Sequence, residues 1–251
     1  MPATGLGPHI EDRDGIRWVT LNRPATLNAV TRDDLRTMTG ALDPLPPGIA
    51  AIALTGAGPR AFSSGVHTEV FADLTVEDAR GFITELGELT ATIRRAPVPT
   101  VCVIRGYCLG GAMEMAMACD LRVVATDAVF GMPEIAVGIP SVLDAALLEQ
   151  YVGLSRAREM LLTGDLYPVG ELATSGFANR LVAPDDLLAA AEQLLARVAS
   201  HSGPAMRAQK RLFRTWQEVG LDAGIAASIG EFAETFAHPE TARRIADYRT
   251  G

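Results

Sequence analysis

The chain has 251 residues and a formal net charge of −8, with 48% hydrophobic and 21% charged residues. This balance is typical of a folded globular protein and excludes a disordered chain. An acidic chain has no global field that would attract nucleic acid or an anionic membrane, so any anionic ligand must be held by local donors. We therefore expect neither nucleic acid nor a membrane among its partners.

The N-terminal segment MPATGLGPHIEDRDG lacks the basic and then apolar stretches of an export signal. No apolar run approaches the roughly 18 to 20 residues that would span a bilayer, so we expect a cytoplasmic protein. Cys102, Cys108 and Cys119 lie in one apolar stretch, at a spacing that fits neither a disulfide framework nor a zinc site. We expect reduced core thiols and no metal site.

The first half of the chain alternates predicted strands and helices. Residues 16–21 (IRWVTL) and the nearly continuous apolar run 48–55 predict strands, the second of them covered on both faces. Thr31 with Asp34, and Thr75 with Asp78, predict two capped helix starts. Residues 100–104 predict the next strand. This order predicts an α/β architecture with largely buried strands.

From Ser141 onward the chain is predicted to be almost wholly helical, apart from a short strand-like segment at 178–183. The helices predicted at 185–200, 204–219 and 221–236 have wide apolar faces. Such faces must cover the core or pack on another subunit.

The stretch 101–134 places two carboxylates in apolar surroundings. Gly110 and Gly111 open a predicted helix, whose first N–H groups lack intrahelical partners and can bind an anion. Glu114 lies one turn further on the same face among Met and Ala residues, which predicts partial burial and a raised pKa. Taken alone, Glu114 could also be a helix-start acid that faces solvent.

Glu134 follows a further apolar strand and a tight turn, so the returning chain could place it opposite the helix of Glu114. The alternative is a helix-start acid after Pro133. The Gly- and Ser-rich segment 61–69 follows an apolar strand, at the end where ligands commonly bind in α/β sheets. One of its N–H groups and that of Gly111 could form a two-donor oxyanion hole, although a surface turn is equally compatible with this segment.

Together these segments resemble the crotonase, or enoyl-CoA hydratase/isomerase, superfamily. The matching parts are NRPATLNA at 22–29, AFSSGVHTEV at 61–70, GYCLGGAMEMAMACDLRVV at 106–124, FGMPE at 130–134 and GIP at 138–140. The resemblance implies a crotonase-like spiral of ββα units with a C-terminal helical trimerisation region. We accordingly assign residues 1–190 to a core that binds acyl-CoA and performs catalysis, and residues 191–251 to oligomerisation.

The resemblance also implies an acyl-CoA substrate, no cofactor beyond the coenzyme A of that substrate, and a homo-trimer or hexamer. The N–H groups of Val66 and Gly111 would hold the thioester carbonyl as it gains enolate character. Glu114 would act as the base toward water and Glu134 as the acid toward Cα. We therefore predict an enoyl-CoA hydratase that adds water across the 2,3 double bond.

The chain departs from the family pattern at three places. Ser141 and Asp144 lie where the family has glycines, and we expect them to reshape the acyl pocket or the water site. His67 could contact the substrate, although a solvent-facing side chain is favoured. Arg249, or Arg244, could replace a lysine of a neighbouring subunit that binds the CoA phosphate.

Three other functions stay open at this point. The same scaffold could isomerise a double bond or hydrolyse a thioester, and a catalytically silent homologue could bind coenzyme A alone. A serine hydrolase would use Ser63 or Ser64 with His67, but the chain lacks the Gly-x-Ser-x-Gly turn of such enzymes.

Overall fold

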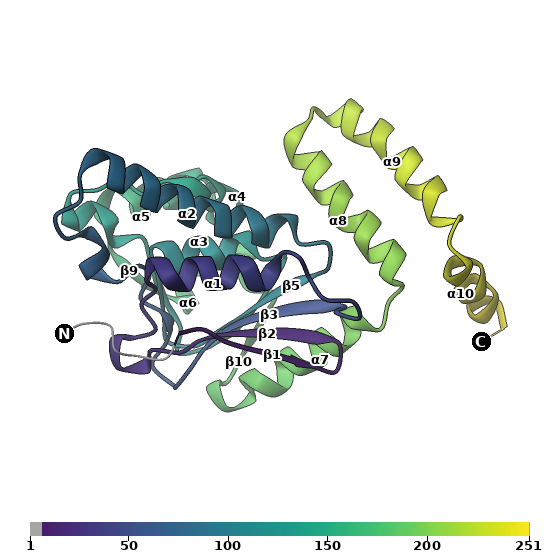
Figure 1. Cartoon of the computed structure of the whole chain (residues 1–251), viewed down its shortest axis with the longest axis horizontal. Helices are drawn as coiled ribbons and strands as arrows, with labels where there is room; N and C mark the ends of the chain where they lie inside the picture. Colours follow the sequence, from purple (N-terminus) through teal and green to yellow (C-terminus); the bar gives the residue numbers. More distant parts are fainter. Residues whose placement is uncertain (1–6, 251) are drawn as a thin grey trace.

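The computed structural model describes residues 7–250, so residues 1–6 of the N-terminal segment considered above, and residue 251, lie outside the described residues. The molecule consists of an α/β body and three C-terminal helices that extend away from it (Figure 1). Within the described range, no helix is both long enough and apolar enough to cross a membrane.

The larger sheet has six strands in the order β1-β2-β3-β5-β7-β10. β1 pairs with β2 in antiparallel fashion, and all other neighbours in this sheet are parallel. The predicted strands at 16–21, 48–55, 100–104 and 178–183 all belong to it. Its strands are β1 (His9–Arg13), β2 (Ile16–Leu21), β3 (Ala51–Gly56), β5 (Thr100–Ile104), β7 (Leu121–Ala125) and β10 (Arg180–Val182).

The smaller sheet has four short strands in the order β4-β6-β8-β9. The first three are parallel, and β9 pairs antiparallel to β8. They are β4 (Ala61–Ser63), β6 (Tyr107–Leu109), β8 (Val129–Gly131) and β9 (Leu166–Pro168).

The two sheets grow together through a repeated strand–strand–helix unit. In each unit the first strand enters the larger sheet and the second enters the smaller one, so the chain advances by one position along both sheets. This arrangement is the predicted spiral of ββα units. The units are β3–β4 with α2 (Val76–Arg95), β5–β6 with α3 (Gly111–Ala118), and β7–β8 with the short 3-10 helix η3 (Pro133–Val137).

The larger sheet is buried on both of its faces, as its continuous apolar strands predict. On one face Ile52, Leu54 and Ile104 join the core beneath α1 (Arg32–Leu42), α2 and α3. On the other face α7 (Leu187–Ala199) packs against strand residues such as Ala53 and Val103. The body therefore has two hydrophobic clusters separated by one sheet.

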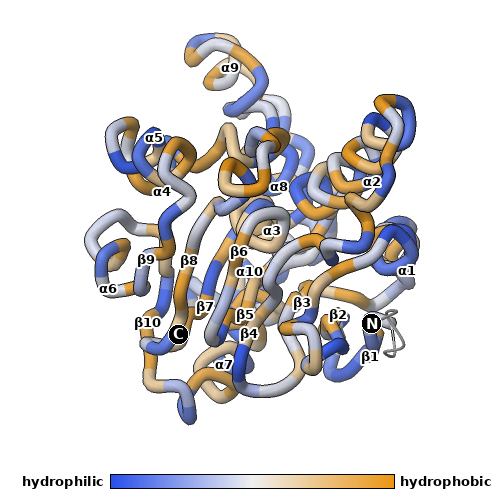
Figure 2. Tube along the Cα trace, turned by 90° about the vertical axis from the view of Figure 1, so that its left-hand side faces the viewer, coloured by the Kyte–Doolittle hydropathy of each residue, from blue (hydrophilic) through white to orange (hydrophobic). Residues whose placement is uncertain are grey.

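Both predicted helix starts are confirmed as capping boxes. The Thr31 N–H donates to the Asp34 carboxylate (2.8 Å), while the Asp34 N–H donates to the Thr31 hydroxyl. Thr75 and Asp78 form the same reciprocal pair at the start of α2. Figure 2 shows hydrophilic and hydrophobic segments alternating along α1 and α2, as expected for amphipathic helices that cover a core.

The predicted helical second half is also confirmed, except that β9 adds a strand that was not predicted. The boundary assigned between residues 190 and 191 falls inside α7, which packs on the larger sheet, so the projecting arm begins only at α8. Besides α7, the helices after η3 are η4 (Leu143–Leu147), α4 (Leu148–Val152), α5 (Leu154–Thr163), α6 (Val169–Leu172), η5 (Ala173–Ser175), η6 (Pro184–Asp186), α8 (Gly203–Glu218), α9 (Leu221–Thr235) and α10 (Pro239–Thr250); η1 (Pro24–Thr26) and η2 (Thr68–Phe71) lie earlier in the chain.

A buried ion pair fastens α8 to the body. Lys210 is 7% exposed, and its Nζ donates to both carboxylate oxygens of Asp120 at 2.7 Å. One of those oxygens also accepts the Thr100 N–H (2.8 Å) at the start of β5. The arm is thus tied to the end of the body where α3 finishes and β5 begins.

The three cysteines are free and buried, as predicted. Burial raises the pKa of the Cys102 and Cys108 thiols well above the ordinary value. Among residues 7–250, no group of three or more His, Cys, Asp or Glu side chains is arranged to hold a metal ion.

Candidate active site

A cavity of about 490 Å³ lies at the carboxyl ends of the three parallel strands of the smaller sheet. The segments that leave β4, β6 and β8 at this end supply Val66, Gly111 and Glu134 respectively. Because parallel strands present their carboxyl ends at one edge, residues far apart in sequence meet there. The remaining wall is mainly apolar and includes Phe71, Phe82, Leu86, Val137, Ile139 and Val142.

The Val66 backbone N–H faces away from its nearest neighbouring segment. Val30 donates its N–H to the Gly65 carbonyl oxygen (2.9 Å) and accepts the His67 N–H (2.9 Å). In such a parallel bridge, the Gly65 carbonyl oxygen and the His67 N–H both point toward Val30. The N–H of Val66, which lies between them, therefore points to the opposite side. Val66 lines the cavity there.

Gly111 is the first residue of α3, so its N–H has no intrahelical acceptor. It lies against Val66, because a Cβ built on Gly111 would be 3.5 Å from Val66 Cγ2. The structure therefore places Val66 and Gly111, whose N–H groups the resemblance pairs, next to each other in the cavity wall.

Two glycines with positive φ permit this close approach. Gly65 has φ +91°, and a Cβ on it would come within 2.7 Å of the Leu109 carbonyl oxygen. Gly110 has φ +54°, and a Cβ on it would collide with the Glu134 carboxylate. Glu134 thus packs directly on the backbone that opens α3, where a side chain would displace it.

Glu114 is almost completely buried, at 3% exposure, which contradicts a solvent-facing acid. Its Oε2 has no hydrogen-bond partner among the described residues. Burial raises the pKa of Glu114 to about 8, with further contributions from the negative charges of Glu134 and Asp144, while the Ala145 N–H acts in the opposite direction. A carboxyl group with this pKa holds a proton at neutral pH.

Glu134 lines the same cavity from the first turn of η3 and is less deeply buried than Glu114. The Ser141 hydroxyl donates to its Oε2 at 2.9 Å. Burial raises the pKa of Glu134, and this rise is opposed by its own backbone N–H and by the Ser141 hydroxyl. The two acids therefore face one cavity with different partners, which can separate their protonation states.

Three other predicted residues lie outside the cavity wall. Asp144 is buried at 4% exposure and forms an ion pair with Arg94, so it does not line the acyl pocket as expected. His67 is 9% exposed, which corrects the solvent-facing alternative, and it lines a separate hollow beside Arg32 and Arg36. Arg249 lies in the last turn of the projecting α10.

The serine hydrolase alternative finds no support in the geometry. Ser63 is fully buried, and its hydroxyl donates to the Asn28 carbonyl oxygen at 2.8 Å. The Ser64 hydroxyl donates to the Thr26 carbonyl oxygen (3.4 Å). Neither hydroxyl is paired with His67, so neither has the adjacent base that an activated serine needs.

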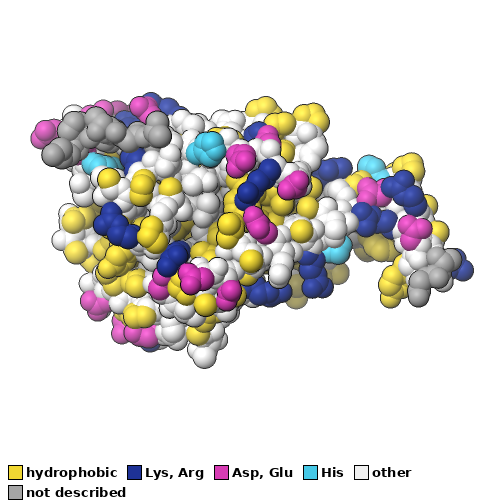
Figure 3. All heavy atoms as spheres, turned by 90° about the horizontal axis from the view of Figure 1, so that it is seen from below, with side chains coloured by type: hydrophobic (Ala, Val, Ile, Leu, Met, Phe, Trp, Pro, Cys, Tyr) yellow, Lys and Arg dark blue, Asp and Glu magenta, His cyan; other side chains and the backbone are white. Residues whose placement is uncertain are grey.

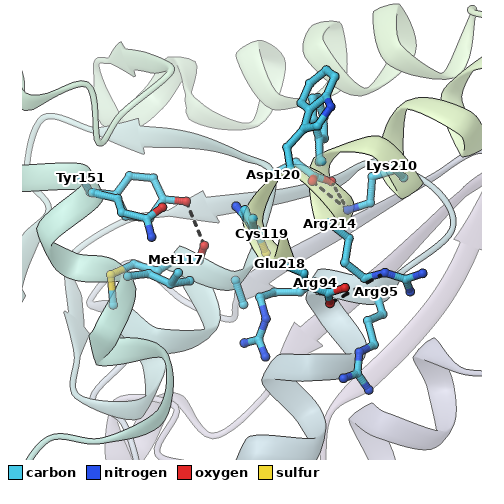
Figure 4. A pocket seen from close by; sticks show the side chains of 15 residues that line it. Arg94, Arg95, Met117, Cys119, Asp120, Tyr151, Lys210, Arg214 and Glu218 are labelled. Carbon is cyan, nitrogen blue, oxygen red and sulfur yellow. Dashed lines mark hydrogen bonds and ion pairs between the residues drawn. The ribbon is translucent and has the colours of Figure 1, made fainter. Parts of the chain in front are cut away.

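A second cavity, of about 510 Å³, lies between α8 and the ends of α2 and α3. Figure 4 shows Arg94 and Arg95 contributed by α2, and Lys210 and Arg214 contributed by α8, around this space, which we call the basic hollow. Tyr151 donates its hydroxyl to the Met117 carbonyl oxygen (3.0 Å) at one side. Sequence reasoning missed this hollow, because its cations come from two helices, α2 and α8, that are more than a hundred residues apart in the chain.

Sequence reasoning also missed the part of α2 in the first cavity. Phe82 and Leu86 belong to a helical stripe that predicts burial, but periodicity alone does not say whether a stripe meets core or ligand space. No local signal distinguishes these residues from Leu89 and Ile93, which the same stripe places in the core.

Comparison with known proteins agrees with this geometry. The enoyl-CoA hydratase/isomerase family matches residues 11–249. A probable enoyl-CoA hydratase of Mycobacterium bovis is 33% identical over 95% of this chain and 92% of its own length. A crotonyl-CoA hydratase of Syntrophomonas wolfei is 27% identical over 91% of this chain and 89% of its own.

Solved structures share the whole architecture. Pseudomonas aeruginosa DspI superposes with a TM-score of 0.93 at 26% identity, covering 100% of this chain and 97% of its own. The enoyl-CoA hydratase of Bacillus anthracis also gives a TM-score of 0.93, at 22% identity, over 98% of this chain and 96% of its own, which supports the fold. With a family match that spans nearly all of its residues, this chain belongs to the enoyl-CoA hydratase/isomerase family.

Proposed function

We propose that this protein is an enoyl-CoA hydratase, which adds water across the 2,3 double bond of an enoyl-CoA thioester. One observation carries the proposal: a buried and a partly buried carboxyl group line a single apolar cavity together with two backbone N–H groups that have no acceptor among the described residues. The hydratase names of the relatives from Mycobacterium bovis and Syntrophomonas wolfei support the same reaction. In this reaction coenzyme A is part of the substrate, and no separate cofactor takes part.

The N–H groups of Val66 and Gly111 would bind the thioester oxygen. Conjugation lets electron density move from the double bond to this oxygen when a nucleophile attacks Cβ, and two fixed donors stabilise the enolate more than the ground-state carbonyl. The positive end of α3 adds to this effect, because Gly111 is its first residue. The apolar wall would hold the acyl group and exclude bulk water.

The two glutamates would move the protons. The oxygen of a water molecule forms a bond to Cβ while its proton passes to an ionised Glu114, and the double-bond electrons move to give the enolate. Glu134 then delivers a proton to Cα, so that the product contains one added water. Exchange with solvent returns the proton from Glu114 to Glu134 before the next turnover.

The free site keeps Glu114 protonated at neutral pH, which is not the state from which hydration starts. A pKa of about 8 places the proton on Glu114 at neutral pH, whereas hydration starts with Glu114 ionised and Glu134 protonated. A protonated Glu114 is the state that dehydration needs, since it can protonate the departing hydroxyl group while Glu134 removes the Cα proton. We therefore expect an enzyme that catalyses both directions.

The test is turnover of crotonyl-CoA and longer enoyl-CoA substrates, followed by the loss of absorbance of the conjugated thioester. Mass analysis of the product distinguishes the alternatives, because hydration adds one water, isomerisation adds nothing and hydrolysis releases free coenzyme A. Absence of turnover on all substrates, together with intact binding of acyl-CoA, would favour a silent coenzyme A-binding protein.

We further propose that the projecting arm assembles the chain into a trimer or hexamer. α9 and α10 expose large apolar side chains, among them Ile229 (72% exposed), Phe232 (69%) and Tyr248 (91%). Figure 3 shows the arm extending from the body with hydrophobic side chains among charged ones. Apolar surface of this extent on a soluble chain calls for a partner, and light scattering of the purified protein tests its stoichiometry.

A further inference from the structure

The feature that the proposed reaction leaves unused is the buried ion pair between Asp144 and Arg94. Asp144 lies in η4 and is 4% exposed, whereas the Arg94 side chain at the end of α2 is 36% exposed. The two residues are 50 positions apart in the sequence. Burial of a carboxylate is costly without a partner, and Arg94 supplies that partner for Asp144.

This pair lies next to Glu114 without lining the cavity. η4 packs against α3 and α2, and the residue after Asp144 is Ala145. The Ala145 N–H, whose closer acceptor is the Val142 carbonyl oxygen (3.0 Å), also stabilises the ionised form of Glu114, while the charge of Asp144 destabilises it. η4 thus acts on Glu114 with two opposing influences.

Few other charges reach Glu114. On α3 itself Glu114 is the sole titratable residue, and β6 contributes Cys108, whose buried thiol stays neutral. Arg122 is directed to the far end of α3, where it donates to the Ala116 and Cys119 carbonyl oxygens. The inner face of α2 is uncharged, with Phe82, Leu86, Leu89, Thr90 and Ile93.

The charged residues that act on Glu114 are Glu134 from η3 and Asp144 from η4, and Asp144 is paired with Arg94. Glu134 is required by the reaction, so it cannot be varied without loss of chemistry. The ion pair is the adjustable part, because each of its members can be neutralised without touching the cavity wall.

We propose that the Asp144–Arg94 ion pair is a positioning pair for Glu114, which ties η4 to the end of α2 beside α3 and sets the protonation state of Glu114 in the free protein. This inference rests on the proposed function. Arg94 also lines the basic hollow (Figure 4). The pair therefore connects the basic hollow to Glu114, which lines the apolar cavity.

The proposal predicts that neutralising Asp144 and neutralising Arg94 have opposite effects on the ionisation of Glu114. Asp144→Asn removes a negative charge and leaves the Arg94 cation unneutralised, which favours ionised Glu114. Arg94→Gln leaves the Asp144 charge beside Glu114 without its counter-ion, which favours protonated Glu114. A residue pair that served only to stabilise the fold would produce a loss in the same direction from either change.

The experiment measures the pH dependence of kcat/KM for hydration, whose alkaline limb reports the free enzyme. We expect the limb to move down by about one pH unit in D144N and up by about one pH unit in R94Q. The double variant D144N/R94Q should lie close to the wild type. The matched control is Arg95→Gln, an exposed neighbour on the same helix, which should leave the profile unchanged.

A second measurement does not need turnover. Each variant is also made with Glu114→Gln, and the difference in unfolding free energy between the Glu and Gln forms is followed with pH. Because the pKa of Glu114 is raised in the folded state, this difference grows as pH rises above the unfolded value and becomes constant above the folded one. The pH at which it becomes constant reports the folded Glu114 pKa.

These two measurements separate the possible failures. Suppose that no enoyl-CoA is hydrated, but the pH at which the unfolding difference becomes constant shifts in opposite directions in D144N and R94Q. The proposed function then fails and the positioning pair stands. If both variants shift the same way, or leave both profiles unchanged while stability falls, the positioning pair is overturned. Should D144N fail to fold, the R94Q variant still decides. An upward shift of its pH profile supports the proposal, and an unchanged profile contradicts it.

Discussion

The two large cavities differ in chemistry rather than in size. The apolar cavity and the basic hollow have volumes of about 490 and 510 Å³. In the basic hollow, three cations have carboxylate partners: Arg94 with Asp144, Lys210 with Asp120, and Arg214 with Glu218 at 3.9 Å. In the apolar cavity, within the part of the chain that the structure describes, Glu114 has an unpartnered oxygen and no cation among the charges that act on it.

This difference teaches which buried charges stabilise a fold and which perform chemistry. A paired ion contributes little reactivity, because its charge is already balanced by its partner. A carboxyl group surrounded by apolar side chains and another acid has a pKa moved toward neutrality, where proton transfer is fastest. The volumes of the two cavities alone would not have identified the cavity that holds the two acids.

The strongest way to break this comparison is to neutralise either acid. We expect Glu114→Gln and Glu134→Gln each to lower kcat by about 10² to 10⁴-fold, the usual contribution of a general acid or base. Binding of acyl-CoA should persist, since the donors of Val66 and Gly111 are unchanged. Glu149→Gln, an exposed acid on α4, is the control. Activity that survives both changes would remove the two-acid mechanism.

The next effect concerns Gly110. Gly110→Ala places a Cβ against the Glu134 carboxylate at a φ that disfavours L-residues. We expect kcat to fall by about 10²-fold, because a shift of about 1 Å in a catalytic group can cost this much. Gly230→Ala, at a helical site with open space around it, should be neutral or slightly stabilising. Steady-state kinetics and thermal unfolding of both variants check this, and equal behaviour would contradict it.

A smaller effect is the pH dependence of the wild type. In the proposed reaction Glu114 and Glu134 hold one proton between them. The pKa of Glu114 is about 8 in the folded protein. Above this pH the proton is lost, so kcat/KM should fall about tenfold for each further pH unit. The raised pKa also means that Glu114 destabilises the fold increasingly as pH rises toward 8, and this loss should disappear in Glu114→Gln. A flat alkaline profile would argue against a buried proton on Glu114.

The smallest effect on activity is expected in the basic hollow. Lys210→Met leaves the Asp120 carboxylate without its cation, and we expect about 3 to 5 kcal/mol of lost stability, as for other broken buried pairs. Arg214→Gln, whose partner is exposed, should cost less than about 1 kcal/mol. Urea unfolding measures both. Neither change should alter kcat at saturating substrate, and a large loss there would give the hollow a role in the reaction.

Local chemistry made much of the fold predictable. The capping boxes at Thr31 and Thr75 use side chains three residues apart, so they are legible in the sequence and mark two helix starts correctly. The long apolar runs of β3 and β5 predict strands because burial on both faces leaves no polar alternation. Interactions within a few residues are those that a sequence displays directly.

The missing parts depend on long-range contacts. β4, β6 and β8 have three residues each, which is too short for any periodicity to show. The ββα units carry no sequence repeat, because their first strands begin at Ala51, Thr100 and Leu121, so the units differ greatly in length. The shared cavity of Glu114 and Glu134 was expected from the resemblance, whereas the Arg94 partner of Asp144 leaves no sequence signal.

The buried thiols of Cys102 and Cys108 provide a built-in reporter of motion. Both are 0% exposed, and they lie on β5 and β6, the strands that lead into α3. A reagent such as a soluble disulfide needs access to a thiolate, so it can react only when these strands separate from the core. The rate of labelling therefore measures how often the strands that lead into the helix of Glu114 open, and ligands that close the cavity should slow it.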